Sequence, residues 1–163
     1  MREAMCVRRF RDRRADRIER NGALMADGAP EIIGLRFELF VTDIAATLKF
    51  YEATLGLVPP EGWSYDGYVP LHSGSVTIGV QTAENLRPDH HFSKEKLSGP
   101  RGVGVEIVIE VADVDGAYDR AHAVAGEVGG ASEPLVDRPW GVRDFRLIDP
   151  DGYYVRVTEM RAG

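Results

Sequence analysis

Hydrophobic and polar residues alternate along residues 35–41, and this period of two predicts a β-strand. A helix is expected directly after the strand, because Asp43 or Thr42 can cap a run whose apolar side chains recur at helical spacing. Gly56 suits the C-terminal cap, since glycine adopts the left-handed conformation without strain. The apolar stripe of this helix consists of Ile44, Leu48, Tyr51 and Leu55.

Short strands and a turn complete this first unit. Asp66-Gly67 is a turn dipeptide, and residues 68–71 and 75–81 have the composition of strands. We therefore expect residues 35–82 to fold as a strand, a helix and two or three further strands.

The same order of elements recurs 70 residues later. Residues 40–46 are echoed by residues 110–116, which predicts two copies of one supersecondary unit. In the second copy, residues 105–111 have a strand pattern, and Asp113 is expected to cap the next helix. The glycines that are candidates for closing that helix are Gly126, Gly129 and Gly130.

The second unit, residues 104–160, ends in a predicted hairpin. Its strands are expected at residues 143–148 and 153–159, joined by Asp-Pro-Asp-Gly at residues 149–152. This tetrapeptide has the residues that a type I turn prefers. Positions that match between the two units are expected to face each other across a shared cavity.

Two segments lie outside the repeat. Residues 83–103 form a polar connector with too little apolar pattern for a regular element. Residues 1–30 carry eight arginines against five acids, so this arm has a net charge of +3 and leaves −9 for the rest. The arm is interpreted as a mobile extension, or alternatively as a segment that packs on the acidic body of a partner subunit.

Composition narrows the class of protein. The 163 residues are 44% hydrophobic and 28% charged, as in an ordinary globular protein. The formal net charge of −6 argues against nucleic acid or an anionic membrane as a partner. The chain has a single cysteine, Cys6, and no apolar run approaches the roughly 20 residues of a membrane helix. A cytoplasmic location is therefore expected.

Three motifs resemble the vicinal oxygen chelate superfamily. They are Phe-Val-Thr-Asp-Ile to Leu-Gly-Leu at residues 40–57, Val-Ala-Asp-Val-Asp at residues 111–115, and Arg-Pro-Trp-Gly to Asp-Pro-Asp-Gly at residues 138–152. That superfamily contains glyoxalase I, extradiol dioxygenases, fosfomycin-resistance enzymes and bleomycin-resistance proteins. The resemblance implies an α+β fold of two tandem βαββ(β) modules, whose open, curled mixed sheet surrounds a cleft, commonly in a homodimer.

The resemblance also implies four metal-ligand positions, which are occupied here by Arg36, Gly79, Glu106 and Arg156. Guanidinium offers no lone pair and glycine has no side chain, so three of the four ligands are missing. We therefore predict no metal cofactor, and a salt-bridge cluster of Arg36, Glu106 and Arg156 that Glu38 can join. Under the alternative, these charges merely pair at a solvated mouth of the cleft.

A different strand register would change this interpretation. A shift that brought Glu38 and Gln81 together with Glu106 or Glu110 would recreate an oxygen-rich site for a divalent metal. The four histidines do not occupy family ligand positions, and they are interpreted as structural or solvated. They are His72, His90, His91 and His122.

Aromatic residues indicate an organic ligand, because flat apolar walls with a few polar anchors suit such a molecule. Trp63, Tyr65 and Tyr68 cluster after the first helix, and Trp140 precedes the predicted hairpin. Trp63 and Trp140 are predicted as pocket walls, although any one aromatic residue can instead fill the core or a dimer contact. The predicted ligand-binding residues are Arg36, Glu38, Phe40, Trp63, Gln81, Glu106, Trp140, Tyr154 and Arg156.

Two functions are compatible with this pattern. The first is a homodimeric binding protein that lacks the metal and sequesters a small aromatic, cationic or polar organic molecule, of which the acidic body would favour a cationic one. The second is an enzyme of the same superfamily, either a lyase or dioxygenase, or a metal-free isomerase or cyclase with Glu106 as general base. The missing ligands favour binding.

Overall fold

The computed structural model describes residues 33–64, 67–92 and 94–160. From residue 35 onward, these residues belong to one compact unit, Leu35–Gly163. The predicted arm, Cys6, Tyr65 and Asp66 lie outside the described residues.

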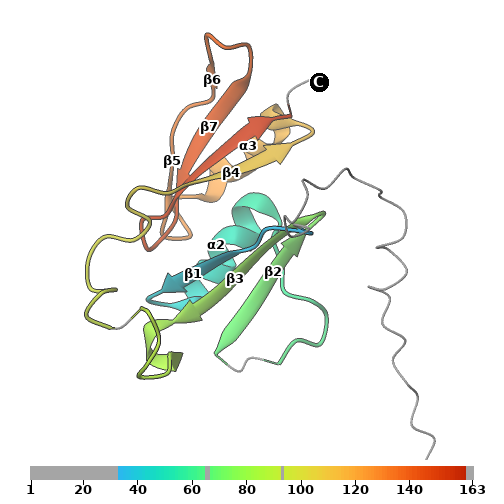
Figure 1. The fold of residues 1–163 in the computed structure, drawn as a ribbon. Coiled ribbons are helices and arrows are strands. Elements are labelled where there is room, and N and C mark those ends of the chain that lie inside the picture. Colours follow the sequence, from blue (N-terminus) through green and yellow to red (C-terminus); the bar gives the residue numbers. More distant parts are fainter. Residues whose placement is uncertain (1–32, 65–66, 93, 161–163) are drawn as a thin grey trace, which may run out of the picture. The chain divides into compact units, whose positions relative to one another are not determined.

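Two short modules make up the fold (Figure 1). The first contains β1, α2, β2, β3 and the 3-10 turn η1, and the second contains β4, α3 and β5 to β8. Their bounds are β1 Phe37–Val41, α2 Ile44–Leu55, β2 Tyr68–Ser73, β3 Val76–Thr82, η1 Ala83–Asn85, β4 Glu106–Val111, α3 Val114–Val124, β5 Ala131–Ser132, β6 Val136–Asp137, β7 Arg143–Ile148 and β8 Tyr154–Glu159.

The strands form two mixed sheets. The first sheet has the order β1-β3-β2, and the second has the order β4-β8-β7-β5, with β6 also paired to β7. In each module the first strand runs parallel to the last, β1 with β3 and β4 with β8, and the remaining pairs are antiparallel. The α+β class with repeated mixed sheets, expected from the sequence, is confirmed.

Both helices begin where the sequence predicts. The Asp43 carboxylate accepts a hydrogen bond from the Ala46 N–H at 3.1 Å, and α2 ends at Gly56, whose φ of 66° is left-handed. Thr42, the other cap candidate, instead donates its N–H to Asp151 at 2.9 Å. The α3 helix begins in the same way at Asp113.

The α3 helix ends differently from α2. Its C-cap is Ala125, which has ordinary right-handed backbone, and the Gly130 N–H donates to the Ala125 carbonyl at 2.9 Å. Among the three candidate glycines, Gly129 has the positive φ, 84°. The chain therefore leaves α3 through Gly129 and Gly130. Gly126, the third candidate, does not have a left-handed backbone conformation.

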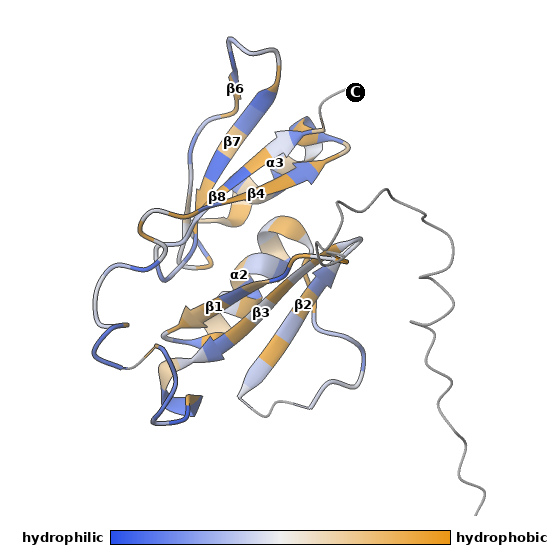
Figure 2. Ribbon diagram, viewed as in Figure 1, coloured by the Kyte–Doolittle hydropathy of each residue, from blue (hydrophilic) through white to orange (hydrophobic). Residues whose placement is uncertain are grey.

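A single hydrophobic core takes up one face of each sheet. Hydrophobic and hydrophilic residues alternate along the strands (Figure 2), and the hydrophobic ones belong to this core. Large side chains of α2, Phe50 and Tyr51, are fully buried in the same cluster. The strand residues in this cluster are Leu39, Val41, Val69, Leu71, Ile78, Val80, Ile107, Ile109, Phe145, Leu147, Val155 and Val157.

Hydrogen bonds connect the first module to the β7–β8 turn of the second module. The buried Tyr51 hydroxyl donates to Asp149 at 3.2 Å, and the Tyr153 hydroxyl donates to the Phe40 carbonyl at 3.1 Å. Burial raises the pKa of Asp149 to about 6, although its carboxylate accepts hydrogen bonds from the Tyr153 and Asp151 N–H groups and from Tyr51. The predicted turn is confirmed by the bond from the Gly152 N–H to the Asp149 carbonyl at 2.9 Å.

Neither helix in the described part of the chain has the length and apolar character that crossing a bilayer requires.

Candidate functional site

Each sheet has a second face, opposite the one that enters the core. We call these the first outer face, formed by β1, β3 and β2, and the second outer face, formed by β4, β8 and β7. Because side chains alternate along a strand, the residues between the core positions lie there. On the first outer face these include Glu38, Phe40, Tyr68, Pro70, Gly79 and Gln81; on the second they include Glu106, Val108, Glu110, Asp144, Arg146, Tyr154, Arg156 and Thr158.

Gly79 occupies the centre of the first outer face. It lies opposite Glu38 on β1 and opposite Pro70 on β2. A Cβ at Gly79 would collide with the Glu38 carboxylate and would lie 2.6 Å from the Tyr68 hydroxyl. The glycine therefore lets these two polar groups lie directly over the strand.

The Glu38 carboxylate is the polar centre of this face. Its Oε1 accepts from Arg36 Nε at 2.6 Å and from the Tyr68 hydroxyl at 3.2 Å. Its Oε2 is buried and has no hydrogen-bond partner among the described residues. Burial, followed by the charge of Glu38, raises the pKa of the Tyr68 phenol.

Aromatic residues border the first outer face, but Phe40 is covered. The Phe92 ring lies 4.7 Å from the Phe40 ring, and the His90 ring lies 5.6 Å from it, centroid to centroid. Sequence patterning did not indicate that the connector covers this position. Trp63 remains 46% exposed and donates its indole N–H to the Tyr68 carbonyl at 3.1 Å.

Arg156 occupies the centre of the second outer face. It lies opposite Val108 on β4 and opposite Arg146 on β7. Glu106 contacts both arginines, with Arg146 Nε at 3.3 Å from its Oε1 and Arg156 Nη2 at 3.5 Å from its Oε2. The Arg146 guanidinium also lies 5.9 Å from the centre of the Tyr154 ring.

The fully buried Asp144 adds two further ion pairs to those of Glu106. Asp144 accepts from Arg146 Nη1 at 2.6 Å and from Arg138 Nε at 2.7 Å. Arg138 follows β6 and reaches back onto the sheet. We call these five residues, in their order of contact, the charged network: Arg138, Asp144, Arg146, Glu106 and Arg156.

The structure divides the salt-bridge cluster that the sequence predicts. Arg36 pairs with Glu38 on the first sheet, and Glu106 pairs with Arg156 on the second, with no ion pair between the two groups in the described residues. The prediction of one cluster was wrong because Arg36 and Glu106 extend from different sheets. Trp140 lies in the β6–β7 loop and is 53% exposed.

Sequence reasoning missed Arg146, Asp144 and Arg138. A signal for the first two was present, because alternation along residues 143–148 and the tight turn at residues 149–152 place Arg146 opposite Arg156. Arg138 stands in a loop without periodicity, so no comparable signal exists for it.

The residues at the family's ligand positions do not fit a divalent metal. Two arginines and a glycine supply no lone pair, and a cation beside Arg156 and Arg146 would be repelled. Within residues 33–64, 67–92 and 94–160, no three His, Cys, Asp or Glu side chains form a group that could hold a metal ion. In the alternative oxygen-rich set, Glu38 and Gln81 belong to the first sheet, whereas Glu106 and Glu110 belong to the second.

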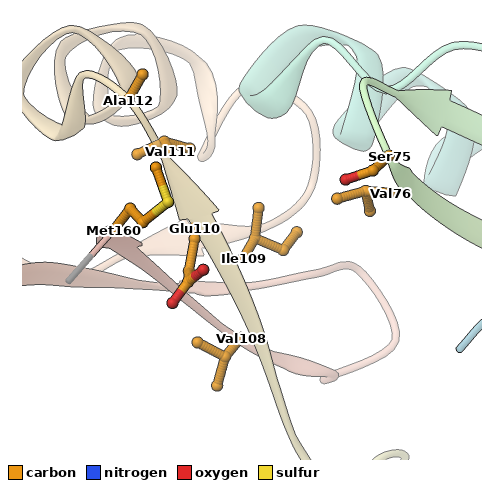
Figure 3. Close-up of a pocket in the computed structure, with 8 residues that line it drawn as sticks. All are labelled: Ser75, Val76, Val108, Ile109, Glu110, Val111, Ala112 and Met160. Carbon is orange, nitrogen blue, oxygen red and sulfur yellow. The ribbon is translucent and has the colours of Figure 1, made fainter. Parts of the chain in front are cut away.

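A pocket of about 460 Å³ borders the free edge of β4 (Figure 3). Val108 and Glu110 extend into it from β4, and Met160 lies beside them. None of the nine predicted ligand-binding residues lines this pocket. Val108 nevertheless connects it to the charged network, because Val108 is also the neighbour of Arg156 in the β4–β8 pair.

Comparisons with known proteins give the family. Residues 35–157 match the Glyoxalase/Bleomycin resistance protein/Dioxygenase superfamily. No curated protein matches the sequence. Among solved structures, a glyoxalase/bleomycin resistance protein from Albidiferax ferrireducens T118 is 25% identical with a TM-score of 0.57, and the match covers 77% of this chain and 97% of that one.

Two further structures have the same fold at lower identity. A glyoxalase/bleomycin resistance protein/dioxygenase from Nocardioides is 21% identical with a TM-score of 0.62, covering 83% of this chain and 87% of that one. The bleomycin-binding protein of Streptomyces verticillus, solved with copper(II)-bleomycin, is 20% identical with a TM-score of 0.55, covering 82% and 100%. With the family match over most of its length, this chain belongs to the Glyoxalase/Bleomycin resistance protein/Dioxygenase superfamily.

Proposed function

We propose that this protein binds a small organic molecule at its second outer face and does so without a metal ion. The observation that carries the proposal is the pairing of Glu106 with Arg146 and Arg156. Glu106 and Arg156 stand at two of the positions for which the family resemblance implies metal ligands. Guanidinium groups recognise ligands through directional hydrogen bonds, whereas a metal would polarise them.

The surroundings of the network support an organic ligand. Tyr154 is a partly buried aromatic residue, and Val108 is 42% exposed beside Arg156. A few charged groups next to apolar surface are the usual composition of a small-molecule site. The bleomycin-binding relative holds an organic molecule on the same fold, which is consistent with binding as the function.

We also propose that the protein acts as a homodimer. The core takes up the inner faces of both sheets, which leaves both outer faces for other contacts. Exposed apolar residues lie along and next to β4, which is the edge strand of its sheet. Such residues are expected on a surface that a second copy of the protein covers. They are Val103, Val105, Val108 and Met160, between 42% and 79% exposed. Size-exclusion chromatography with light scattering tests this, and a monomer at micromolar concentration contradicts it.

Binding is favoured over general-base catalysis by the position of Glu106. Each of its carboxylate oxygens lies near a guanidinium, Oε1 near Arg146 and Oε2 near Arg156. A general base needs an oxygen free to accept a proton from the substrate. Because each oxygen keeps a second lone pair, an enzyme that uses Glu106 in this way would have to bring the substrate's proton to the carboxylate beside two arginines.

The experiment combines metal analysis with a ligand screen. Protein purified without chelator should contain far less than one Fe, Mn, Ni or Zn per chain, and a library of small aromatic molecules should include compounds that raise its melting temperature. Trp63 and Trp140 fluorescence provides a second binding signal. One tightly held metal per chain, or no stabilising compound in the library, contradicts the proposal.

A further inference from the structure

Arg146 and Arg156 lie directly opposite each other in the β7–β8 pair. Like charges at such positions repel, because the Cβ atoms of a cross-strand pair are only about 4.5–5.5 Å apart. Both side chains are largely withdrawn from water, with exposed fractions of 11% and 28%. Reduced solvent screening strengthens both this repulsion and the attraction of any anion that approaches the pair.

The acids of the network do not balance its arginines. Arg138, Arg146 and Arg156 contribute three positive charges, against one each from Asp144 and Glu106. Asp144 is engaged by Arg138 and Arg146, so Arg156 depends on Glu106 at 3.5 Å. The Arg156 Nε is buried and has no hydrogen-bond partner within the described part of the chain. A donor of a charged group is therefore left unsatisfied at the centre of the face.

We infer that the ligand carries an oxyanion, a carboxylate or a phosphate, that is bound by Arg156 and Arg146. This inference rests on the proposed function, since it names the chemical class of the molecule at that site. An oxyanion offsets the excess charge and can accept hydrogen bonds from the exposed part of the Arg156 guanidinium, whose side chain is 28% exposed and whose fork matches the geometry of an oxyanion. The Tyr154 ring and the exposed Val108 flank the arginines and would contact the organic body of the ligand.

Glu110 sets the orientation of that ligand. It lies on the same face of β4, opposite Thr158 and one row beyond Val108. Its carboxylate repels an anion at Arg156, so the oxyanion should lie toward the Glu106 end of the arginine pair. Replacing Glu110 with Gln should therefore strengthen anion binding, even though the protein as a whole carries a net charge of −6.

Four matched probes test the inference on the full chain: benzoate, phenyl phosphate, benzamide and benzamidine. Binding is followed by the Nε–H resonances of arginine in ¹⁵N NMR. A charge-assisted hydrogen bond contributes about 1.5–3 kcal/mol, so benzoate or phenyl phosphate should bind about 10- to 100-fold more tightly than benzamide. The Arg156 Nε–H should shift, and the anion that shifts it at the lower concentration identifies the oxyanion class.

Variants of Arg156 test whether this arginine, and not the overall charge of the protein, selects the anion. Arg156→Gln should abolish the preference for anions, and Arg156→Lys should keep part of it, because lysine retains the charge but loses the fork. Arg87→Gln is the control, since Arg87 is 80% exposed and paired only with Asp89 among the described residues. It should bind all four probes as the unmodified protein does.

The outcomes distinguish the inference from the proposed function. Equal or tighter binding of benzamide or benzamidine overturns the oxyanion inference and leaves small-molecule binding intact. An Arg156 Nε–H that no anion shifts at millimolar concentration also overturns it. The proposed function fails separately, when the wider library contains no compound that binds.

Discussion

The two outer faces share a backbone plan and differ at the centre. In each module a first strand runs parallel to a last strand, and the middle position is Gly79 on one face and Arg156 on the other. Around Gly79 a single exposed arginine pairs with Glu38; around Arg156 three arginines and two acids form a continuous network. The two units share their helix N-caps and the parallel pairing of first and last strand, whereas the side chains on their outer faces differ.

Burial is the physical difference between the faces. Asp144 is completely buried, whereas the side chains of Arg36 and Glu38 are 59% and 30% exposed. An exposed ion pair contributes little to stability, but removal of one partner of a buried pair leaves an uncompensated charge. The second face should therefore be sensitive to charge removal, and the first face should tolerate it.

Loss of the buried acid should have the largest effect. Asp144→Ala leaves Arg138 and Arg146 without their shared partner, so the free energy of unfolding should fall by about 3–5 kcal/mol. The matched change on the first face, Glu38→Ala, should cost between about 0 and 1 kcal/mol. Urea unfolding followed by circular dichroism measures both. Equal losses would mean that the two faces do not differ as described.

The junction between the modules should respond to pH through Asp149. Its pKa is raised from 3.8 to about 6 in the folded protein, so between these values the folded state binds more protons than the unfolded state. The contribution of this group to stability is therefore greatest below about pH 4 and declines through pH 6, by about 2–3 kcal/mol in total.

Asp149→Asn isolates this effect, because asparagine keeps the shape and can still accept from the backbone N–H groups of Asp151 and Tyr153. The stability of the variant relative to the unmodified protein should rise between pH 4 and pH 7. Urea midpoints at several pH values provide the measurement. A difference that stays constant with pH would show that Asp149 titrates normally.

A methyl group at the centre of the first face should have the smallest effect. Gly79→Ala displaces the Glu38 carboxylate and the Tyr68 hydroxyl, while alanine restricts the unfolded chain, so stability should change by about 1 kcal/mol or less. The pKa of Tyr68 should move back toward 10, because both its burial and its contact with Glu38 decrease. Ultraviolet titration compared with Tyr68→Phe identifies this phenol, and an unchanged titration contradicts the described packing.

The sequence predicted local features well. Asp43, Asp113 and Gly56 have their expected capping roles, and the turn at residues 149–152 joins β7 to β8. These caps and turns depend on residues that are close together in the sequence, so sequence patterns can predict them. The two-residue strands β5 and β6 are too short for any period to appear.

The candidate site was predicted only in part, because its contacts are long-range. Glu106 and Arg156 were identified through their matched positions, but Arg138 reaches Asp144 from a loop whose path has no sequence signature. The contact of Phe92 with Phe40 likewise depends on how the connector folds back over β1. Arg36 pairs with Glu38, which the predicted cluster allowed, but not with Glu106. Repeat symmetry indicates matching positions but does not fix the distance between two sheets.

We propose that Arg156, with Arg146 opposite it, takes the place of a metal ligand at the second outer face. The most direct test is titration of the ¹⁵N-labelled protein with Mn²⁺, whose unpaired electrons broaden resonances of nearby groups. We predict that one equivalent of Mn²⁺ leaves the Arg156 and Arg146 Nε–H resonances sharp, because the guanidiniums repel the cation. Selective broadening of these two resonances at one equivalent would place a metal at the site and contradict the account.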